Sequence, residues 1–245
     1  MRKIHIAFLS IFFLSLFLVS CSNDAYETGD SRYSYLRADF VEANTNSQAQ
    51  LVSAITDNDV SLSFSKPSTV SWMTTADSTY RALLYYNIGV GNGDKDNGSA
   101  MTVEPVSIRM VYVLNPALNP QDTTDSNHKP QTSTLKSQTT DPVHFQSSWL
   151  NANHFYANLS LALMTGVADS IDAVQSMGLC CDSVIAAADG HHTYYYRFLH
   201  SQNNVPQYYK TTVYVSIPTK RMTTGDVVRL SLNTYDGWIT REFRL

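Results

Sequence analysis

Apolar and polar residues alternate along the second half of the chain with the two-residue repeat of half-buried β-strands. Leucine, valine or isoleucine takes alternate positions in residues 158–163, 212–217 and 228–233, and mostly polar residues stand between them. A sheet with one buried apolar face and one solvent-exposed polar face is typical of antiparallel strands that are covered on one side. The pattern therefore predicts an antiparallel β-sandwich over residues 143–245.

The first half of the chain shows the same repeat in shorter runs. Residues 60–64 and 106–110 alternate, and between them TYRALLYYNIGV, residues 79–90, is a longer apolar stretch with β-forming residues at both ends. Four or five strands within about eighty residues are typical of a small barrel. We therefore expect a barrel domain over residues 33–114 and an all-β chain.

Two segments interrupt this pattern. Residues 115–142 contain no aromatic residue, and their apolar residues are Ala117, Leu118 and Leu135. Such a segment buries too little surface to offset the entropy of ordering it, so we expect an inter-domain linker there. Residues 167–177 carry apolar side chains at helical spacing, which predicts a short helix in a connection between two strands.

The N-terminus has the order of an export signal. Arg2 and Lys3 precede an apolar run that ends near Val19. The run is shorter than the roughly 20 apolar residues that a transmembrane helix needs. The run closes in LVSC, residues 18–21, which resembles the lipobox of bacterial lipoproteins. Residues 1–20 are thus expected to be removed, although a plain signal peptide with an incidental cysteine is the alternative.

The lipobox reading makes Cys21 a lipidation site. Acyl chains such as palmitate on this cysteine would fasten the protein to membrane lipid, because each buried methylene contributes about 0.8 kcal/mol. Residues 21–32 then form a polar, acidic tether. We expect a lipid-anchored protein of the cell envelope, most simply in the outer membrane.

Charge and cysteine content narrow the function classes. The full chain has a formal charge of −4, and removing Arg2 and Lys3 makes the mature chain more acidic. An acidic exported protein is a poor match to nucleic acid, whose binding depends on basic contacts to phosphates. Cys180 and Cys181 are neighbours in the chain, where disulfide geometry is unfavourable, so no framework disulfide is expected.

Two patterns suggest metal ions and both are incomplete. The loop GNGDKDNG, residues 91–98, begins like an EF-hand, but Asn97 and Val103 stand where that loop needs glycine and a bidentate glutamate. Glycine, asparagine and aspartate are equally typical of a tight turn. His191 and His192 diverge on a strand, and they form a metal site only if His144, His154 and His200 meet them in space.

Signatures of catalysis are missing from the sequence. It contains neither a G-x-S-x-G nucleophile motif nor a G-x-x-x-x-G-K phosphate loop. The sequence thus favours a protein without enzymatic activity or cofactor. The aromatic-rich C-terminal region offers a candidate binding patch for a sugar or a partner protein. Its residues are Tyr195, Tyr208, Tyr209 and Trp238. The alternative is that these aromatic residues are buried in the core of the sandwich.

Several ordered blocks carry a family resemblance that covers nearly the whole chain. They are the lipobox and tether, TYRALLYYNIG (79–89), VSIRMVYVLNP (106–116), SSWLNANHFYANLSLAL (147–163), HHTYYYRFLH (191–200) and GDVVRLSLNTYDG (225–237). Together they resemble the NigD-like lipoproteins of Bacteroidetes. The resemblance implies an N-terminal OB-like barrel and a C-terminal β-sandwich.

The resemblance implies no established activity and transfers no site residues. The family name comes from a bacteriocin-associated gene cluster, which hints at immunity or envelope defence. Residues 164–190 depart from the family pattern as a long insertion between two strands. The leading hypothesis is a non-enzymatic, lipid-anchored envelope protein with a binding or protective role; the alternatives are a carbohydrate-binding accessory lipoprotein of a glycan-uptake system and a metal-dependent envelope enzyme.

The anchor can be tested directly. We expect mass spectrometry of the mature protein from a Bacteroidetes host to find an acylated N-terminus at Cys21, and Cys21→Ala to lose the acyl mass and membrane association. An unacylated mature wild-type protein that is released into the medium would contradict the lipobox reading.

Overall fold

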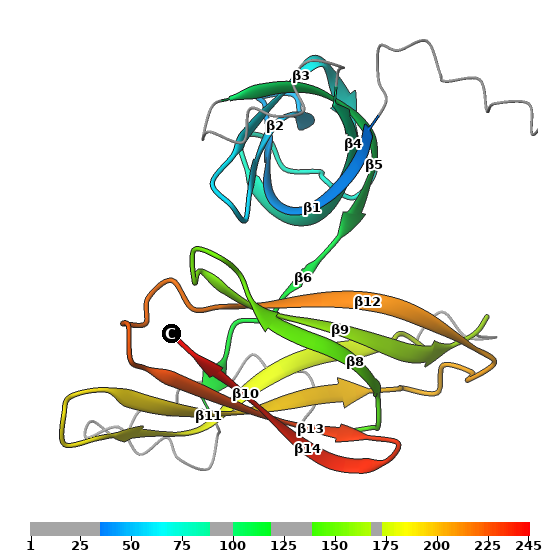
Figure 1. Ribbon diagram of the computed structural model, residues 1–245. Helices are drawn as coiled ribbons and strands as arrows, with labels where there is room; N and C mark the ends of the chain where they lie inside the picture. Colours follow the sequence, from blue (N-terminus) through cyan, green and yellow to red (C-terminus); the bar gives the residue numbers. More distant parts are fainter. Residues whose placement is uncertain (1–34, 89–99, 119–138, 168–172) are drawn as a thin grey trace, which may run out of the picture.

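The computed structural model describes residues 35–88, 100–118, 139–167 and 173–245, and every regular element in these ranges is a β-strand (Figure 1). The strands form a closed five-stranded barrel followed by a sandwich of a four-stranded and a five-stranded sheet. The predicted all-β class, with a barrel before a sandwich, is confirmed. A search of the described residues for a helix long and apolar enough to cross a membrane finds none.

The barrel closes because its first strand pairs with two partners. β1 joins β2 on one side and β4 on the other, in the circular order β1-β2-β3-β5-β4. Aliphatic side chains and Tyr86 fill the interior, where the Tyr86 hydroxyl donates to Asp39 at 2.7 Å. The strands are β1 (Tyr35–Thr45), β2 (Gln50–Thr56), β3 (Ser61–Thr69), β4 (Thr79–Ile88) and β5 (Met101–Met110).

The sandwich core lies between the inner faces of two sheets. The alternating residues identified from the sequence point inward; Leu159, Val215 and Leu230 are fully buried, and Val213 is partly buried. One sheet has the order β6-β12-β9-β8 and the other β14-β13-β11-β10-β7. The strands are β6 (Tyr112–Val113), β7 (Ala117–Leu118), β8 (His144–Leu150), β9 (Tyr156–Thr165), β10 (Ser176–Ala186), β11 (His192–Ser201), β12 (Tyr209–Pro218), β13 (Val227–Thr234) and β14 (Gly237–Arg244).

The sandwich includes residues that the sequence pattern assigned elsewhere. β6 falls within the expected barrel domain of residues 33–114 but pairs with β12, and β7 falls within the expected linker of residues 115–142 but pairs with β10. Both are parallel pairs of only two residues, too short for any periodicity to reveal. The boundary between the domains therefore lies before residue 112, and residues 119–138 are outside the described ranges.

The helix expected at residues 167–177 is wrong where the structure describes it. Residues 173–175 are irregular, and β10 begins at Ser176; residues 168–172 are outside the described ranges. β10 lies between β11 and β7, so the presumed insertion of residues 164–190 contributes a strand of the five-stranded sheet. Period-two positions such as Met177 and Leu179 pack into the core, and this tertiary burial outweighs the helical spacing of the preceding segment.

A buried arginine joins the two domains. Arg81 extends from β4 of the barrel, and its guanidinium donates to both carboxylate oxygens of Asp57 at 2.6 and 2.7 Å. On the sandwich side its Nε donates to the Ser216 hydroxyl at 3.2 Å, and the guanidinium lies 4.3 Å from the ring centre of Tyr156. The residue is 5% exposed, so the charge is held almost entirely by these partners.

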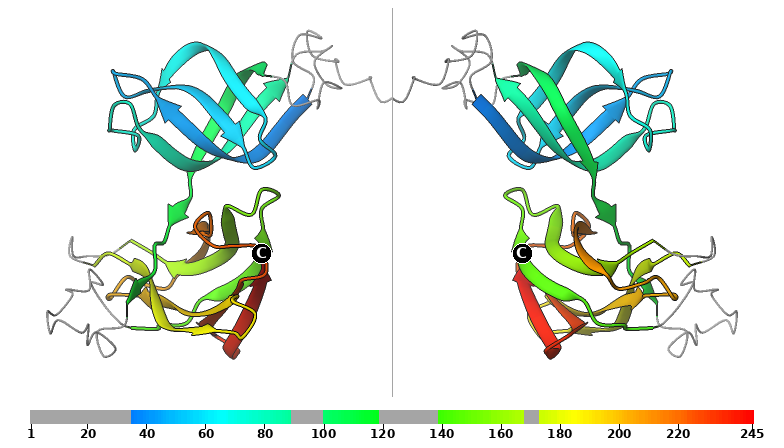
Figure 2. Two further views of the ribbon diagram at one scale, coloured as in Figure 1. Left: turned by 90° about the vertical axis from the view of Figure 1, so that its left-hand side faces the viewer. Right: turned by 90° about the vertical axis from the view of Figure 1, so that its right-hand side faces the viewer.

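Aromatic contacts surround this ion pair. Phe40 of β1 packs edge-on against Trp149 and Tyr214, with ring centres 5.2 and 5.3 Å apart. The Tyr156 hydroxyl donates to Glu42 at 2.8 Å, and burial, assisted by this bond to a carboxylate, raises the pKa of Tyr156 to about 12. The barrel thereby rests on the outer face of the four-stranded sheet, as the two side views show (Figure 2).

Removing the arginine should weaken the whole molecule. We expect Arg81→Ala to lower the free energy of unfolding by about 3 kcal/mol, because it leaves the Asp57 carboxylate without its charge partner in a largely buried joint. The measurement is urea unfolding followed by tryptophan fluorescence. Arg109→Ala, at an exposed position of β5, is the control and should change stability by about 0.5 kcal/mol or less; equal effects of the two variants would contradict this account.

Candidate ligand pocket at the open end of the sandwich

The inward-facing row of β12 changes character along the strand. Ile217 and Val215 are fully buried between the sheets, whereas Val213 is only partly buried and Thr211 and Tyr209 are exposed. The row therefore leaves the aliphatic core as it approaches the start of the strand. A cavity opens where the core ends.

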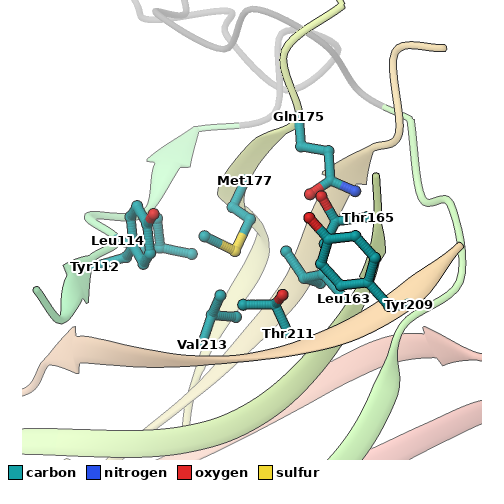
Figure 3. Close-up of a pocket in the computed structure, with 9 residues that line it drawn as sticks. All are labelled: Tyr112, Leu114, Leu163, Thr165, Gln175, Met177, Tyr209, Thr211 and Val213. Carbon is teal, nitrogen blue, oxygen red and sulfur yellow. The ribbon is translucent and has the colours of Figure 1, made fainter. Parts of the chain in front are cut away.

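Three other strands contribute to this cavity. β9 supplies Leu163 and Thr165, which follow its buried leucines, and β10 supplies Met177. The short β6 and the residue after it supply Tyr112 and Leu114 from the side. Figure 3 shows these side chains pointing toward a common space from both sheets.

The pocket has a volume of about 350 Å³ and an apolar floor with a polar rim. Leucine, methionine and valine side chains form the floor, and hydroxyl and amide groups stand at the rim. No acidic, basic, histidine or cysteine side chain is among the lining residues that the structure describes: Tyr112, Leu114, Leu163, Thr165, Gln175, Met177, Tyr209, Thr211 and Val213.

Hydrogen bonds hold the polar rim in place. The Gln175 and Gln202 side-chain amides both donate to the carbonyl of Met164, at 2.5 and 2.9 Å. The Tyr208 amide donates to the carbonyl of Thr165 at 2.9 Å, which fixes the start of β12 against the end of β9. A neutral, amphipathic and preformed pocket can bind a ligand through apolar contact and a few directed hydrogen bonds.

The four aromatic residues of the predicted patch lie in two separate places. Tyr209 of β12 lines the pocket, and Tyr208, which is 78% exposed, lies just before that strand. Tyr195 lies on the outer face of the five-stranded sheet, where the guanidinium of Arg229 is 5.8 Å from its ring centre. Trp238 is 55% exposed on β14 of that second sheet. The structure thus places Tyr209 in the pocket lining, with Tyr208 next to it in the chain, and leaves the other two residues elsewhere.

The histidines also occupy separate positions. His144 stacks on Tyr235 with ring centres 4.3 Å apart, and His192 lies 3.6 Å from Asp226. Across the described ranges, no group of three or more histidine, cysteine, aspartate or glutamate side chains is arranged to hold a metal ion. The loop of residues 91–98 and Cys21 lie outside those ranges.

His200 is buried beneath the segment that leads into β8. Its Nδ1 lies 3.1 Å from the carbonyl oxygen of Asp141, and within the described part of the chain its Nε2 has no hydrogen-bond partner. Burial lowers the pKa of His200, against a smaller opposing effect of Asp141. The Asp141 carboxylate accepts a hydrogen bond from the backbone N–H of Gln202 at 2.7 Å.

The chain thus has a defined architecture, a closed five-stranded barrel followed by a two-sheet sandwich with a pocket at its open end. Solved structures share the overall fold. A NigD-like immunity protein from Bacteroides caccae superposes with a TM-score of 0.60 over 86% of this chain and 98% of that chain, at 19% sequence identity. The resemblance to the NigD-like family is confirmed in the fold.

Two further structures have the same fold. A protein of unknown function (DUF1344) from Bacteroides vulgatus gives a TM-score of 0.59 at 14% identity and covers 86% of this chain and 91% of its own. A candidate lipoprotein from Bacteroides fragilis gives 0.52 at 10% identity and covers 85% and 96%. No family model and no curated protein matches the sequence.

Sequence reasoning found Tyr209 but missed the pocket itself. One signal was available: the inward row of β12 passes from Val213 to Thr211 and Tyr209, so its aliphatic character stops before the strand does. Besides β9, the remaining walls come from β6 and β10, which the pattern assigned to the barrel and to an inserted connection. The pocket could not be predicted without placing β6 and β10 in the sandwich.

His200 gives a testable pH dependence. Its folded pKa is depressed, so the unfolded chain binds more protons, and we expect stability to fall as the pH drops below about 6.5. Urea unfolding at a series of pH values measures the slope. His200→Gln should flatten it between pH 7 and 5, whereas His154→Asn, at an exposed position with positive φ, should retain it. An unchanged slope in His200→Gln would contradict the assignment.

Proposed function

We propose that this chain is a lipid-anchored, non-enzymatic protein of the cell envelope that binds a macromolecular partner through the pocket of its sandwich domain. The observation that carries the proposal is the neutral, preformed pocket beside the buried core of the sandwich. The lipobox at Cys21 supplies the location, with the outer membrane as the proposed site.

The chemistry of the lining favours binding over catalysis. General acid–base catalysis most often uses imidazole, and also carboxyl, amine, thiol or phenol groups placed beside the substrate. Of these the lining described offers phenols alone, and the rest of the rim consists of the hydroxyls of Thr165 and Thr211 and the amide of Gln175. These polar side chains can donate and accept hydrogen bonds, which suits recognition of an uncharged ligand.

The barrel serves as the membrane-side support in this proposal. β1 begins fourteen residues after Cys21, so the tether holds the barrel within about 50 Å of the acyl chains even when fully extended. The Arg81 joint then connects the barrel to the sheet that carries the pocket. A partner near the membrane surface would meet the pocket at a limited range of heights.

The names of the structural neighbours agree with this role. One is an immunity protein, and another, from Parabacteroides distasonis, is described as toxin-related. Immunity requires recognition of another protein, which a binding pocket on an anchored scaffold can provide. The candidate lipoprotein from Bacteroides fragilis has the same fold and fits the anchor proposed here.

Carbohydrate binding is the second candidate. Tyr208 and Tyr209 are consecutive, exposed and next to the pocket, and aromatic rings at such sites stack against sugar faces. A glycan array distinguishes this candidate. Binding of a glycan that is lost in Tyr208→Ala and Tyr209→Ala would select the carbohydrate-binding function.

Pocket variants test the binding function. We expect immobilised mature protein to retain an envelope component, and Thr211→Arg to reduce its retention at least 10-fold, because a charge is placed in an uncharged pocket. The readout is quantitative mass spectrometry of the eluate from solubilised envelopes.

Trp238→Ala is the matched control, since it removes an exposed aromatic side chain from the other sheet. It should retain the component at the wild-type level. Equal retention by wild type, Thr211→Arg and Trp238→Ala would exclude the pocket as the binding site.

A further inference from the structure

β12 has a free backbone edge beside the pocket. Its partner β6 covers only the far part of the strand, where Tyr112 pairs with Val215 and Val113 with Ser216. On that side, residues 209–214 pair with no strand that the structure describes. Their other side is fully paired with β9.

The backbone groups on this edge can be identified. The Leu114 amide donates to the Ser216 carbonyl at 3.0 Å, so the backbone N–H and C=O of Ser216 point toward β6. No bulge interrupts the β12–β9 register, and backbone direction repeats every second residue. The N–H and C=O groups of Tyr214, Thr212 and Lys210 therefore point to the same, open edge.

The free edge and the pocket are continuous. The inward side chains of the same stretch, Tyr209, Thr211 and Val213, line the pocket, and Met177 of β10 lines its opposite wall. On the side away from β11, β10 pairs with β7 at Cys180 and Cys181, and no other strand in the described ranges pairs there. An extended chain laid along β12 would place every second side chain in the space between the two sheets.

This edge carries fewer charged side chains than β14, the edge strand of the other sheet. β14 carries Arg241, Glu242 and Arg244, and Glu242 forms ion pairs with Arg244 and with Arg229 of β13. Charges on edge strands discourage pairing with other chains. In residues 209–214 of β12 the one charged side chain is Lys210.

We propose that this edge of β12 binds an extended, apolar-rich peptide segment of a partner protein by β-strand addition. The inference rests on the proposed function, that the pocket is the binding site, and names the chemistry of its partner. The segment pairs with Lys210, Thr212 and Tyr214 through its backbone and places uncharged side chains at alternate positions in the pocket. β6 already pairs with β12 in this way over two residues, so the new strand continues an existing interface.

The backbone array favours a peptide over other ligands. Main-chain hydrogen bonds give strand addition its affinity, and side-chain pockets at alternate positions give it specificity. An acyl chain fills a pocket without satisfying these donors and acceptors. A sugar has hydroxyl groups but no matching repeat of about 6.8 Å along a strand.

The probe is a displayed library of random nine-residue peptides, selected against the full mature protein and then measured individually by fluorescence anisotropy. We expect the selected peptides to carry apolar residues at alternate positions. Binding should slow amide exchange at Thr212 and Tyr214. Thr211→Arg should weaken binding at least 10-fold.

A matched pair of substitutions isolates the backbone bond. Thr212→Pro removes the N–H at the open edge and leaves the ladder to β9 intact, whereas Thr212→Ala removes the same side chain and keeps the N–H. Thr212→Pro should weaken peptide binding at least 10-fold and Thr212→Ala less than 3-fold. If Thr212→Pro unfolds, as thermal melting would show, selected peptides with one N-methylated amide replace it and should lose binding in the same way.

Several results would overturn the inference. Equal binding by Thr212→Pro and Thr212→Ala would show that the edge is not used, as would N-methylated peptides that bind normally. Failure to select any peptide, while Thr211→Arg still abolishes retention of an envelope component, would reject the peptide and leave the pocket function standing. Self-association that is lost in Thr212→Pro would identify a second copy of the chain as the occupant instead.

Discussion

The architecture depends on one buried cation. Removing a guanidinium from water is costly unless its charge is paired and its donors are satisfied, and Arg81 meets both conditions only with groups from two domains. Asp57 of the barrel neutralises the charge of Arg81. On the sandwich, Ser216 accepts a hydrogen bond from the guanidinium, and the ring of Tyr156 packs against it. Neither domain alone completes the set. The orientation of the barrel against the four-stranded sheet therefore follows from the requirements of one side chain.

β12 connects the Arg81 joint to the pocket, because its two faces contact different parts of the molecule. Its outward residues Tyr214 and Ser216 contact the barrel, and its inward residues pass from the core into the pocket. One backbone edge is paired with β9 and the other is mostly open. Fixing the outer face against the barrel holds the strand in place, so its inner row can leave the core without the sheet closing over it.

The two-residue repeat in the sequence was sufficient to predict the strands and which of their side chains face the core. The inward rows at Leu159, Val215 and Leu230 follow from a repeat of two, and so does the two-sheet core that they build. The pocket also depends on β6, whose two-residue pairing has no period, and on β10, which follows a segment with helical spacing. The Arg81 joint combines residues more than a hundred positions apart, and an isolated arginine in a strand gives no indication of such partners.

The crossing of residues 112–118 from one sheet to the other bears on how the chain can be divided. This segment follows the barrel directly in the chain, yet it caps β12 and β10, which are synthesised much later. The last step in assembling the sandwich must therefore wait for the C-terminal strands to be made. A recombinant fragment that starts at residue 143 lacks both β6 and β7. It therefore exposes the unpaired edges of β12 and β10 and is prone to aggregate. Starting such a fragment at residue 111 keeps the covering peptide with the strands it protects.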